Sequence, residues 1–326
     1  MKAIVRTRYG SPDVLQLNEV ERPVPKDDEI LVKVQAASVN PLDWHTLRGK
    51  PLLVRTGGGG WRRPKDQRLG VDLAGRVEAV GSNVTRFQVG DEVFGRGYGA
   101  LADYACARES ALIAKPANLS FEAAAAVPIA ALTALGALRD KGQLQPGQQV
   151  LIQGASGGVG SFAVQIAKAL GADVTAVCST RNVDTARSLG ADRVIDYTRE
   201  DFTKGRRKGR QRYDLILAVD GYRPIWAYRR ALRPNGRFVL TGASTHLLRA
   251  VFQGMLLGPA ISKLGRKKMG IFMARPTHED LVWLKELLEA GKLVPVIDRC
   301  YPLSEAAEAI RYLEAGHARG KVVITV

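Results

Sequence analysis

A glycine-rich motif lies near the middle of the chain: Val150-Leu-Ile-Gln-Gly154-Ala-Ser156-Gly157-Gly158-Val159-Gly160-Ser-Phe-Ala-Val-Gln165. A short apolar strand runs into glycines, and the glycines run into a helix whose apolar residues recur with helical spacing. Glycine lets the backbone turn tightly and approach a phosphate, while the first turn of the helix offers unpaired N–H donors. The pattern predicts a dinucleotide site with the pyrophosphate against Gly154, Ser156, Gly157, Gly158, Val159 and Gly160. The alternative is a tight strand–helix turn without a ligand.

Strands and helices alternate around this turn. The expected strands are Gln149–Gln153, Val174–Cys178, Arg193–Ile195, Leu215–Val219 and Arg237–Leu240, and the expected helices are Val159–Leu170, Val183–Leu189 and Pro224–Leu232. This alternation is typical of a doubly wound parallel sheet, in which ligands bind at the carboxyl edge, where Asp220 follows a strand. Ile271–Ala274 is expected to add a last strand, and pairing of this strand across a two-fold axis would make a homodimer.

The end of the second of these strands bears on the second phosphate of the cofactor. A site for NAD usually carries Asp or Glu about 20 residues after the glycines to bind the ribose hydroxyls. This chain has Ser179, Thr180 and Arg181 there, and its first acid is Asp184. Hydroxyls and a guanidinium suit a 2′-phosphate, because Arg forms charge-assisted forked hydrogen bonds with it. NADPH is therefore favoured; the alternative is that Arg181 is a solvated residue at a helix start.

The two ends of the chain have a different character. Lys2–Arg6, Glu29–Ala36 and Gly75–Val80 are short β-branched runs separated by Pro, Gly and Asp, which indicates a small barrel or sandwich. After the alternating region, helices are expected at Glu279–Ala290 and Ser304–Ala315, and strands at Val294–Asp298 and Lys321–Val326.

Composition excludes several classes of protein. The 326 residues are 46% hydrophobic and 25% charged, which fits a globular protein and excludes wholesale disorder. Three scattered cysteines form no disulfide framework and no cysteine-rich zinc site, so a reducing, cytoplasmic location is expected. The sequence turns polar too soon for a secretory signal, and residues 123–138 do not make a convincing membrane span. The net charge of +16 leaves nucleic acid, a membrane or an anionic small molecule open as partners.

Further motifs accompany the glycine turn: Ala37-Ser-Val-Asn-Pro-Leu-Asp43, Gly70-Val-Asp-Leu-Ala-Gly-Arg-Val-Glu-Ala-Val-Gly81, Val89-Gly-Asp-Glu-Val-Phe94 and Gly190-Ala-Asp-Arg-Val-Ile-Asp-Tyr197. With these motifs the chain resembles, over nearly its whole length, the medium-chain dehydrogenase/reductase superfamily, and specifically its zinc-free quinone oxidoreductase-like branch. The resemblance implies an α/β protein of two domains. A GroES-like, β-rich catalytic domain would comprise residues 1–122 and 277–326, and a Rossmann dinucleotide-binding domain with a doubly wound parallel sheet would comprise residues 123–276.

The resemblance also bears on zinc. Zinc alcohol dehydrogenases carry a Cys where this chain has Asn40, and Gly-His-Glu where it has Gly70-Val71-Asp72. A catalytic zinc needs about three protein ligands and Val is not one, so no bound metal is expected. Without a Lewis acid to lower the pKa of a hydroxyl group, alcohol oxidation is disfavoured. Quinones and α,β-unsaturated carbonyls, which are already polarised, are the expected hydride acceptors.

The same resemblance assigns roles to individual residues. Asn40 would lie beside the nicotinamide and donate its amide N–H to the acceptor carbonyl; an Asx-turn before Pro41 is the alternative. Asp43 would orient the site, or cap the helix that follows. Contacts with the cofactor are implied for Thr133 at the nicotinamide, Tyr197 near the adenosine phosphate, Thr241 at the nicotinamide ribose, and Lys321. A helix-interior hydroxyl and a plain strand-start lysine are the alternatives for Thr133 and Lys321.

The expected function is NADPH-dependent hydride transfer to a quinone or an α,β-unsaturated carbonyl without a metal. The alternatives are an NAD(P)-dependent alcohol or aldehyde dehydrogenase, and a non-catalytic NADPH- or RNA-binding protein. The basic run 204–212 lacks aromatic stacking partners, so a solvated loop is expected and nucleic acid is disfavoured. Residues 246–269, apolar with basic residues, are expected to pack between helices, or to form a lid that touches a membrane surface transiently.

Overall fold

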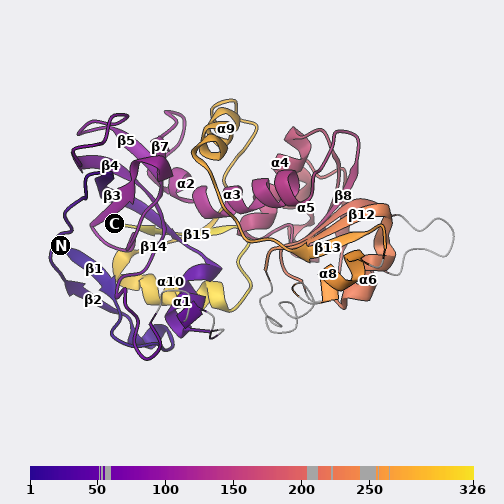
Figure 1. Cartoon of the computed structure of the whole chain (residues 1–326), viewed down its shortest axis with the longest axis horizontal. Coiled ribbons are helices and arrows are strands. Elements are labelled where there is room, and N and C mark those ends of the chain that lie inside the picture. The colour runs from indigo at the N-terminus through magenta and orange to yellow at the C-terminus, as the bar shows by residue number, and fades with distance from the viewer. Residues whose placement is uncertain are drawn as a thin grey trace. The chain divides into compact units, whose positions relative to one another are not determined.

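The computed structural model describes residues 1–50, 52, 54–55, 60–203, 212–221, 223–242, 255, 257–263 and 265–326. The chain forms two compact units (Figure 1). The first unit comprises Met1–Ala130, Thr277–Gly291 and Pro295–Val326, and the second comprises Ala131–Pro276 and Lys292–Val294. Residues 204–211 of the expected basic loop, and 246–254, 256 and 264 of the expected lid, lie outside the described residues.

A mixed sheet forms the first unit. Its strands are β3 (Glu29–Val39), β4 (Asp72–Val80), β5 (Glu92–Arg96), β6 (Tyr104–Arg108), β7 (Leu112–Ala114), β14 (Ile297–Pro302) and β15 (Lys321–Thr325). They run in the order β14-β15-β3-β4-β5-β7, with β6 paired to β3, while β1 (Lys2–Val5) and β2 (Gln16–Glu19) pair with each other. Because β15 pairs antiparallel with β3, the end of the chain completes a sheet that its first third begins.

The long strand β3 carries the core of the first unit. Ile30, Val32, Ala37 and Val39 are all buried in one apolar cluster, and the shift in strand register between Val34 and Ala36 lets even- and odd-numbered residues share it. The helices of this unit are α1 (Pro41–Arg48), α2 (Phe121–Ala125), α9 (His278–Glu289) and α10 (Ala306–Glu314). Helix α10 packs on β15 and α1, and it adds Ile310 to the same cluster.

A parallel sheet forms the second unit. Its strands are β8 (Gln149–Gln153), β9 (Asp173–Cys178), β10 (Arg193–Asp196), β11 (Tyr213–Ala218), β12 (Leu232–Leu240) and β13 (Lys268–Ile271). Its helices are α3 (Pro128–Gly136), α4 (Gly158–Ala169), α5 (Val183–Ser188), α6 (Ile225–Ala231) and α8 (Gly258–Lys263). Helix α3 begins in the first unit. The strand order is β10-β9-β8-β11-β12-β13, and each neighbouring pair is parallel. The chain winds outward from β8 in one direction and from β11 in the other. Ligands bind outside the carboxyl ends of the strands at such a switch point.

Several boundaries differ from those that the sequence indicates; β12, for example, begins at Leu232 and not at Arg237. Three of the differences have a physical reason in the structure. Strand β13 covers Lys268–Ile271 and not Ile271–Ala274; as the end strand of the sheet order it tolerates lysine. Strand β14 begins at Ile297 and not at Val294, whose N–H instead donates to the Gln165 side chain over 2.8 Å. The first unit extends to Ala130, beyond the expected boundary at residue 122, because α2 packs on β3 and β4.

Short helical turns complete the described structure. They are the 3-10 turns Pro12–Val14, Glu109–Ala111, Thr180–Asn182 and Leu303–Glu305 and the π-helical turn Ala137–Lys141 after α3. Among the helices that the described residues form, none has the length and apolar character needed to cross a membrane.

Candidate functional site

The glycine turn joins the end of β8 to the start of α4. Gly154 follows the strand with a φ of 80°, a left-handed conformation that glycine adopts without strain. A Cβ atom on Gly160 would lie 2.0 Å from the carbonyl oxygen of Gly154, so a side chain at this position would force the helix away from the turn. Gly157 is the N-cap of α4, and a Cβ atom there would meet nothing closer than 3.7 Å. The open space before the helix and its unpaired first N–H groups form a cradle that fits a phosphate.

The predicted cofactor residues gather at one edge of the parallel sheet. The register aligns the carboxyl ends of the strands, because Gln153 pairs with both Val177 and Ala218, and Ala218 pairs with Leu240. The predicted residues follow these ends: Gly154 after β8, Ser179 after β9, Tyr197 after β10, Asp220 shortly after β11 and Thr241 after β12. The structure therefore brings them to the edge at which the glycine turn lies.

Two buried amide side chains that were not among the predicted site residues fix this edge. Asn182 donates to the hydroxyls of Ser156 and Ser179 over 3.0 and 3.1 Å, which ties the glycine turn to the end of β9. Gln153 donates to the backbone carbonyl of Asp220 over 2.7 Å, which ties the end of β8 to that of β11. A buried amide needs hydrogen-bond partners. A glutamine inside an apolar strand could therefore have identified Gln153 from the sequence as a residue that fixes this edge.

The residues expected at the 2′-phosphate meet an acid that was not among the predicted site residues. Thr180 donates its hydroxyl to the carboxylate of Asp196 over 2.6 Å. This hydrogen bond lowers the pKa of Asp196. Arg181 is exposed in the turn that follows β9, and Tyr197 is half exposed beside Asp196. The end of β9 therefore combines a guanidinium with a carboxylate that comes from the neighbouring strand.

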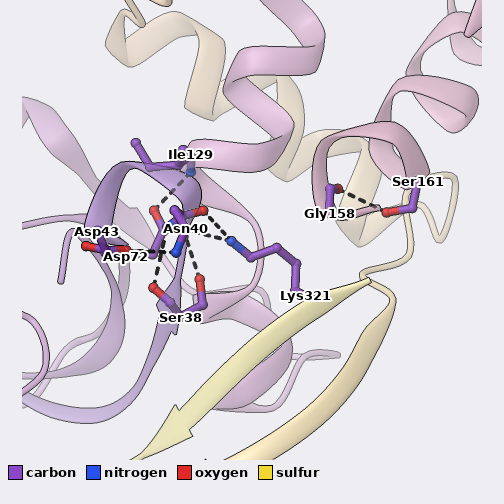
Figure 2. Close-up of polar contacts among 8 residues, drawn as sticks. All are labelled: Ser38, Asn40, Asp43, Asp72, Ile129, Gly158, Ser161 and Lys321. Atoms are coloured by element: carbon purple, nitrogen blue, oxygen red, sulfur yellow. Dashed lines mark hydrogen bonds and ion pairs between the residues drawn. The ribbon is translucent and has the colours of Figure 1, made fainter. Parts of the chain in front are cut away.

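A buried polar cluster lies in the first unit, where β3 ends and β4 and β15 begin (Figure 2). Asp72 is at its centre and is fully buried. One carboxylate oxygen of Asp72 accepts from Ser38 Oγ at 2.9 Å, Asn40 Nδ2 at 2.9 Å and Lys321 Nζ at 3.3 Å. The other accepts from the N–H of Ile129 at 3.0 Å. Four donors compensate a carboxylate that would otherwise be costly to bury.

Asn40 is engaged on both sides of its amide within this cluster. Its amide oxygen accepts from Lys321 Nζ over 2.6 Å, and its amide nitrogen donates to Asp72 and to the carbonyl of Ser38. The amide nitrogen of Asn40, which was expected to donate to the carbonyl of the hydride acceptor, therefore donates to groups within the first unit. Lys321 is no plain strand-start lysine, because its side chain is 3% exposed and ion-paired with Asp72. Contact of Lys321 with a cofactor stays a prediction.

Asp43 caps helix α1. Its carboxylate accepts from the N–H of Asn40 over 2.7 Å, and its own N–H donates to the carbonyl of Asn40 over 2.9 Å. The capping alternative placed Asp43 before the helix, whereas α1 begins at Pro41 with Asn40 as its N-cap, and Asp43 closes a capping box from within the first turn. Burial raises the pKa of Asp43 to about 7, and the nearby charge of Asp72 contributes to the rise. Asp43 is therefore partly protonated near neutral pH.

Helix α3 carries Thr133, which is half-buried and belongs to the second unit. The helix begins at Pro128, where a missing N–H costs nothing, and the next N–H, that of Ile129, donates to Asp72. Asp72 thus fixes the start of the helix on which Thr133 lies. A contact between Thr133 and a nicotinamide stays a prediction.

Arg96 adds a positive charge that was not among the predicted site residues. It ends β5 directly opposite Asp72 of β4, so both side chains leave the same face of the sheet. Its Nε is buried without a hydrogen-bond partner in the described structure. Burial lowers the pKa of Arg96, and the charge of Asp72 opposes this effect.

The residues at the expected zinc position do not fit a zinc ion. The Asp72 carboxylate already binds the ammonium of Lys321, and Asn40 is hydrogen-bonded to both. Across the described ranges of the chain, no three His, Cys, Asp or Glu side chains come together in a way that would hold a metal. A catalytic zinc needs about three such ligands.

Two protein families match the sequence. The alcohol dehydrogenase GroES-like domain matches residues 26–117, and the zinc-binding dehydrogenase family matches residues 189–324. The first match lies within the first unit, and the second match begins in the second unit. Together with the two sheets, the matches confirm the expected fold of a GroES-like domain and a Rossmann-like parallel sheet.

Known proteins resemble the chain along its whole length. It is 34% identical to a chloroplastic quinone-oxidoreductase homolog of Spinacia oleracea, over 99% of this chain and 98% of that protein. It is 33% identical to the chloroplastic NADPH-dependent alkenal/one oxidoreductase of Arabidopsis thaliana, over 99% of this chain and 79% of that protein. The solved quinone oxidoreductase of Coxiella burnetii superposes with a TM-score of 0.86 at 32% identity, over 100% of this chain and 99% of that one. These similarities cover both units.

Proposed function

Because the chain belongs to the quinone oxidoreductase-like branch of the medium-chain dehydrogenase/reductase superfamily, an oxidoreductase family, we propose that it transfers hydride from NADPH to a quinone or an α,β-unsaturated carbonyl. One observation carries the proposal: the glycine turn opens α4 at the sheet edge where the register also places Ser179, Asp220 and Thr241. A dinucleotide needs such a cradle with polar groups beside it.

The residues of the second unit would hold the cofactor. The turn from Gly154 to Gly160 would bind the pyrophosphate, and Thr241 and Asp220 would hydrogen-bond near the nicotinamide end. When bound, the nicotinamide supplies the hydride. Asn182 keeps Ser156 and Ser179 in place, so this part of the site is formed before the cofactor arrives.

The preference for NADPH is supported by Arg181 and by the hydroxyl of Ser179. Arg181 is exposed at the end of β9, where a guanidinium can bind a 2′-phosphate. Asp196 favours NADH, which has no 2′-phosphate, because its carboxylate accepts a hydrogen bond from Thr180 and would repel a phosphate. We propose that the guanidinium outweighs the carboxylate, since Thr180 and Arg199 already engage that carboxylate, whereas the forked donors of a guanidinium match a phosphate.

Reaction without a metal is supported by the chemistry of the cluster in the first unit. Lys321 pairs with Asp72 and donates to Asn40, so its ammonium occupies the place at which a metal ion would have to meet these two residues. It does not lower the pKa of a hydroxyl group as zinc does, so alcohol oxidation is disfavoured. Acceptors that are polarised from the start remain, with solvent as the proton source.

An oxidation assay tests this proposal. NADPH and NADH are offered with a panel of quinones and enones, and alcohols are offered with NADP⁺, before and after dialysis against a chelator. We expect NADPH oxidation with quinones or enones that dialysis does not change. Alcohol oxidation by protein with tightly bound zinc would establish an alcohol or aldehyde dehydrogenase instead. Tight NADPH binding without oxidation across the panel would establish a non-catalytic binding protein.

Replacing Arg181 tests the cofactor preference. Arg181→Ala should lower kcat/KM for NADPH about tenfold, because it removes a charge-assisted bond to the 2′-phosphate, and should leave kcat/KM for NADH unchanged. Arg187→Ala is the matched control, since Arg187 is exposed on the helix that follows and pairs with Asp184. The assignment of Arg181 to the 2′-phosphate would be refuted if Arg181→Ala lowered kcat/KM equally for NADPH and NADH. It would also be refuted if Arg187→Ala lowered kcat/KM for NADPH as much as Arg181→Ala does.

A further inference from the structure

The positive charge of the chain is concentrated in one segment. Residues 202–278 hold 17 of the 48 Lys and Arg residues and only 2 of the 32 Asp and Glu residues. This segment therefore carries +15 of the formal net charge of +16, and the rest of the chain is nearly neutral. Charge of one sign on one part of a protein attracts partners of the opposite sign.

Part of this charge lines a cavity of about 250 Å³ in the second unit. Its charged lining residues are Arg212, Arg229, Arg266 and Lys267, with Pro234, Ile261 and Gly265 beside them. Arg229 lies on α6, and Arg266 and Lys267 lie between α8 and β13; Figure 1 shows α6 and α8 side by side. In the described part of the chain, none of the four cations forms an ion pair with Asp or Glu.

The cations are held close together at an electrostatic cost. Lys267 donates to the carbonyls of Arg229 and Leu232 over 2.6 and 2.8 Å, which fixes its ammonium at the end of α6. Burial lowers the pKa of Lys267, and the charges of Arg212 and Arg229 lower it further. A bound anion would remove this repulsion.

The cavity lies away from the glycine turn. Strands β11 and β13 begin beside it, as Arg212 precedes Tyr213 and Lys267 precedes Lys268, and α6 ends beside it. The amino and carboxyl ends of parallel strands lie at opposite edges of a sheet. An anion in this cavity is therefore distinct from the dinucleotide.

A tryptophan lies beside Arg229, one of the residues that line the cavity. Trp226 is 50% exposed and lies one turn before Arg229 on α6. The guanidinium of Arg229 is 5.8 Å from the centre of its ring. Tryptophan beside Lys and Arg is typical of residues at the boundary between lipid and water.

We propose that this face of the second unit, formed by Trp226, Arg229, Arg212, Arg266 and Lys267, docks onto a bilayer that contains anionic phospholipids. The cavity takes a lipid phosphate, and Trp226 enters the headgroup layer. A membrane fits better than a nucleic acid, because a single strand needs several free aromatic faces in a row and this face offers one ring, with a guanidinium over it. The proposal does not depend on the hydride acceptor.

Vesicle flotation at low salt tests the proposal. The full chain should float with vesicles of phosphatidylcholine and phosphatidylserine, should not float with phosphatidylcholine alone, and should be released as salt rises. The tryptophan emission should shift to shorter wavelength on binding, and Trp226→Phe should remove most of this shift. Arg229→Gln with Arg266→Gln should weaken binding about 30-fold, since two basic residues near the surface are lost.

A matched control separates this face from net charge. Arg8→Gln with Lys33→Gln removes the same charge from exposed residues of the first unit and should leave vesicle binding unchanged. Melting curves should show no loss of stability in either double variant, because all four residues are exposed, and the variant with Arg229→Gln and Arg266→Gln should gain stability as repulsion among the cations falls. Equal loss of binding in the two double variants would overturn the proposal, as would failure of the unmodified protein to float.

Two competitors decide the nature of the ligand. Inorganic phosphate at matched ionic strength should not release the protein from vesicles; binding of phosphate alone, without flotation, would mean a site for a free anion and would overturn the proposal. Single-stranded RNA should compete weakly. Release from vesicles by RNA at lower concentration than by any salt would overturn the proposal in favour of nucleic acid.

Discussion

At the scale of single residues, the pair of Lys321 and Asp72 has the largest predicted effect on stability. Both side chains are almost fully buried, and Lys321 also bonds to Asn40. Lys321→Met would leave the Asp72 carboxylate buried without its cation. We expect this variant to lose about 3–5 kcal/mol in free energy of unfolding, measured by urea denaturation.

A double variant checks that the ion pair is the cause. Lys321→Met with Asp72→Asn removes both charges, so its loss should be clearly smaller than the sum of the two single losses. The amide that this variant carries at position 72 can still accept from the N–H of Ile129, so the start of α3 keeps its hydrogen bond. Additive losses would mean that the two side chains contribute independently.

Asp43 makes stability depend on pH. Its pKa is about 7 in the folded protein and about 3.9 in an unfolded chain, so the folded state binds more protons between these values. The contribution of Asp43 to the free energy of unfolding is therefore complete below about pH 4 and is lost as pH rises through about 7. Asp43→Asn can still accept from Asn40 but has no proton to lose.

The difference between the two proteins isolates this effect. As pH rises from about 4 to about 7, the unmodified protein should lose stability relative to Asp43→Asn. The free energy of unfolding of the variant minus that of the unmodified protein should therefore increase over this interval and stay constant above about pH 7. Urea denaturation across this interval measures it. Parallel curves would show that Asp43 keeps an ordinary pKa.

These residues also mark the limit of what the sequence predicts. The motif around Asn40 and Asp43 is local, and a capping role for Asp43 was predicted from it, although the helix begins at Pro41 and not after Asp43. The contacts of Asn40 with Asp72 and Lys321 span 32 and 281 residues of the chain. They arise from the pairing of β3 with β4 and β15, and no local pattern encodes that pairing.

At the scale of elements, two glycines of the turn between β8 and α4 have different roles, because Gly160 is needed for packing and Gly157 faces the space for a ligand. A Cβ atom on Gly160 would lie 2.0 Å from the Gly154 oxygen, so Gly160→Ala should lower the free energy of unfolding by about 1–3 kcal/mol. A Cβ atom on Gly157 meets nothing closer than 3.7 Å, so Gly157→Ala should change stability by less than about 0.5 kcal/mol.

The same two variants should differ in cofactor binding. Gly157→Ala should weaken NADPH binding about tenfold or more, because its methyl group occupies the space before the helix N-terminus. Calorimetric titration with NADPH measures this, and melting curves give the stability. Full affinity in a stable Gly157→Ala protein would place the pyrophosphate elsewhere.

Elements were predicted well where their signals are local. The strand, the glycines and the helix of this turn are contiguous, so apolar periodicity and glycine spacing sufficed to locate them. Strand β13 was placed too late because Lys267 and Lys268 disfavour a strand, yet its place at the end of the sheet order lets Lys268 remain exposed. Strand β14 was placed too early because Val294 bonds to a glutamine far away in sequence.

At the scale of the whole molecule, the uneven charge predicts that the two units respond differently to salt. Residues 202–278 carry +15, and like charges in the second unit repel one another, whereas the first unit is nearly neutral. Raising sodium chloride from about 10 to about 150 mM shortens the screening length from about 30 to about 8 Å. Screening of this repulsion should stabilise the second unit.

Hydrogen exchange followed by mass spectrometry resolves the two units. We expect amides of β11 and β12 in the cofactor-free protein to exchange several-fold more slowly at the higher salt concentration, since a gain of about 1 kcal/mol in opening free energy slows exchange about fivefold. Amides of β3 and β4 should change little, because opposite charges in the first unit are nearly balanced. Equal slowing of exchange in both units would show that salt acts on the whole protein and not on the repulsion in the second unit. Faster exchange in the second unit at the higher salt concentration would mean that attraction between opposite charges, and not repulsion, dominates there.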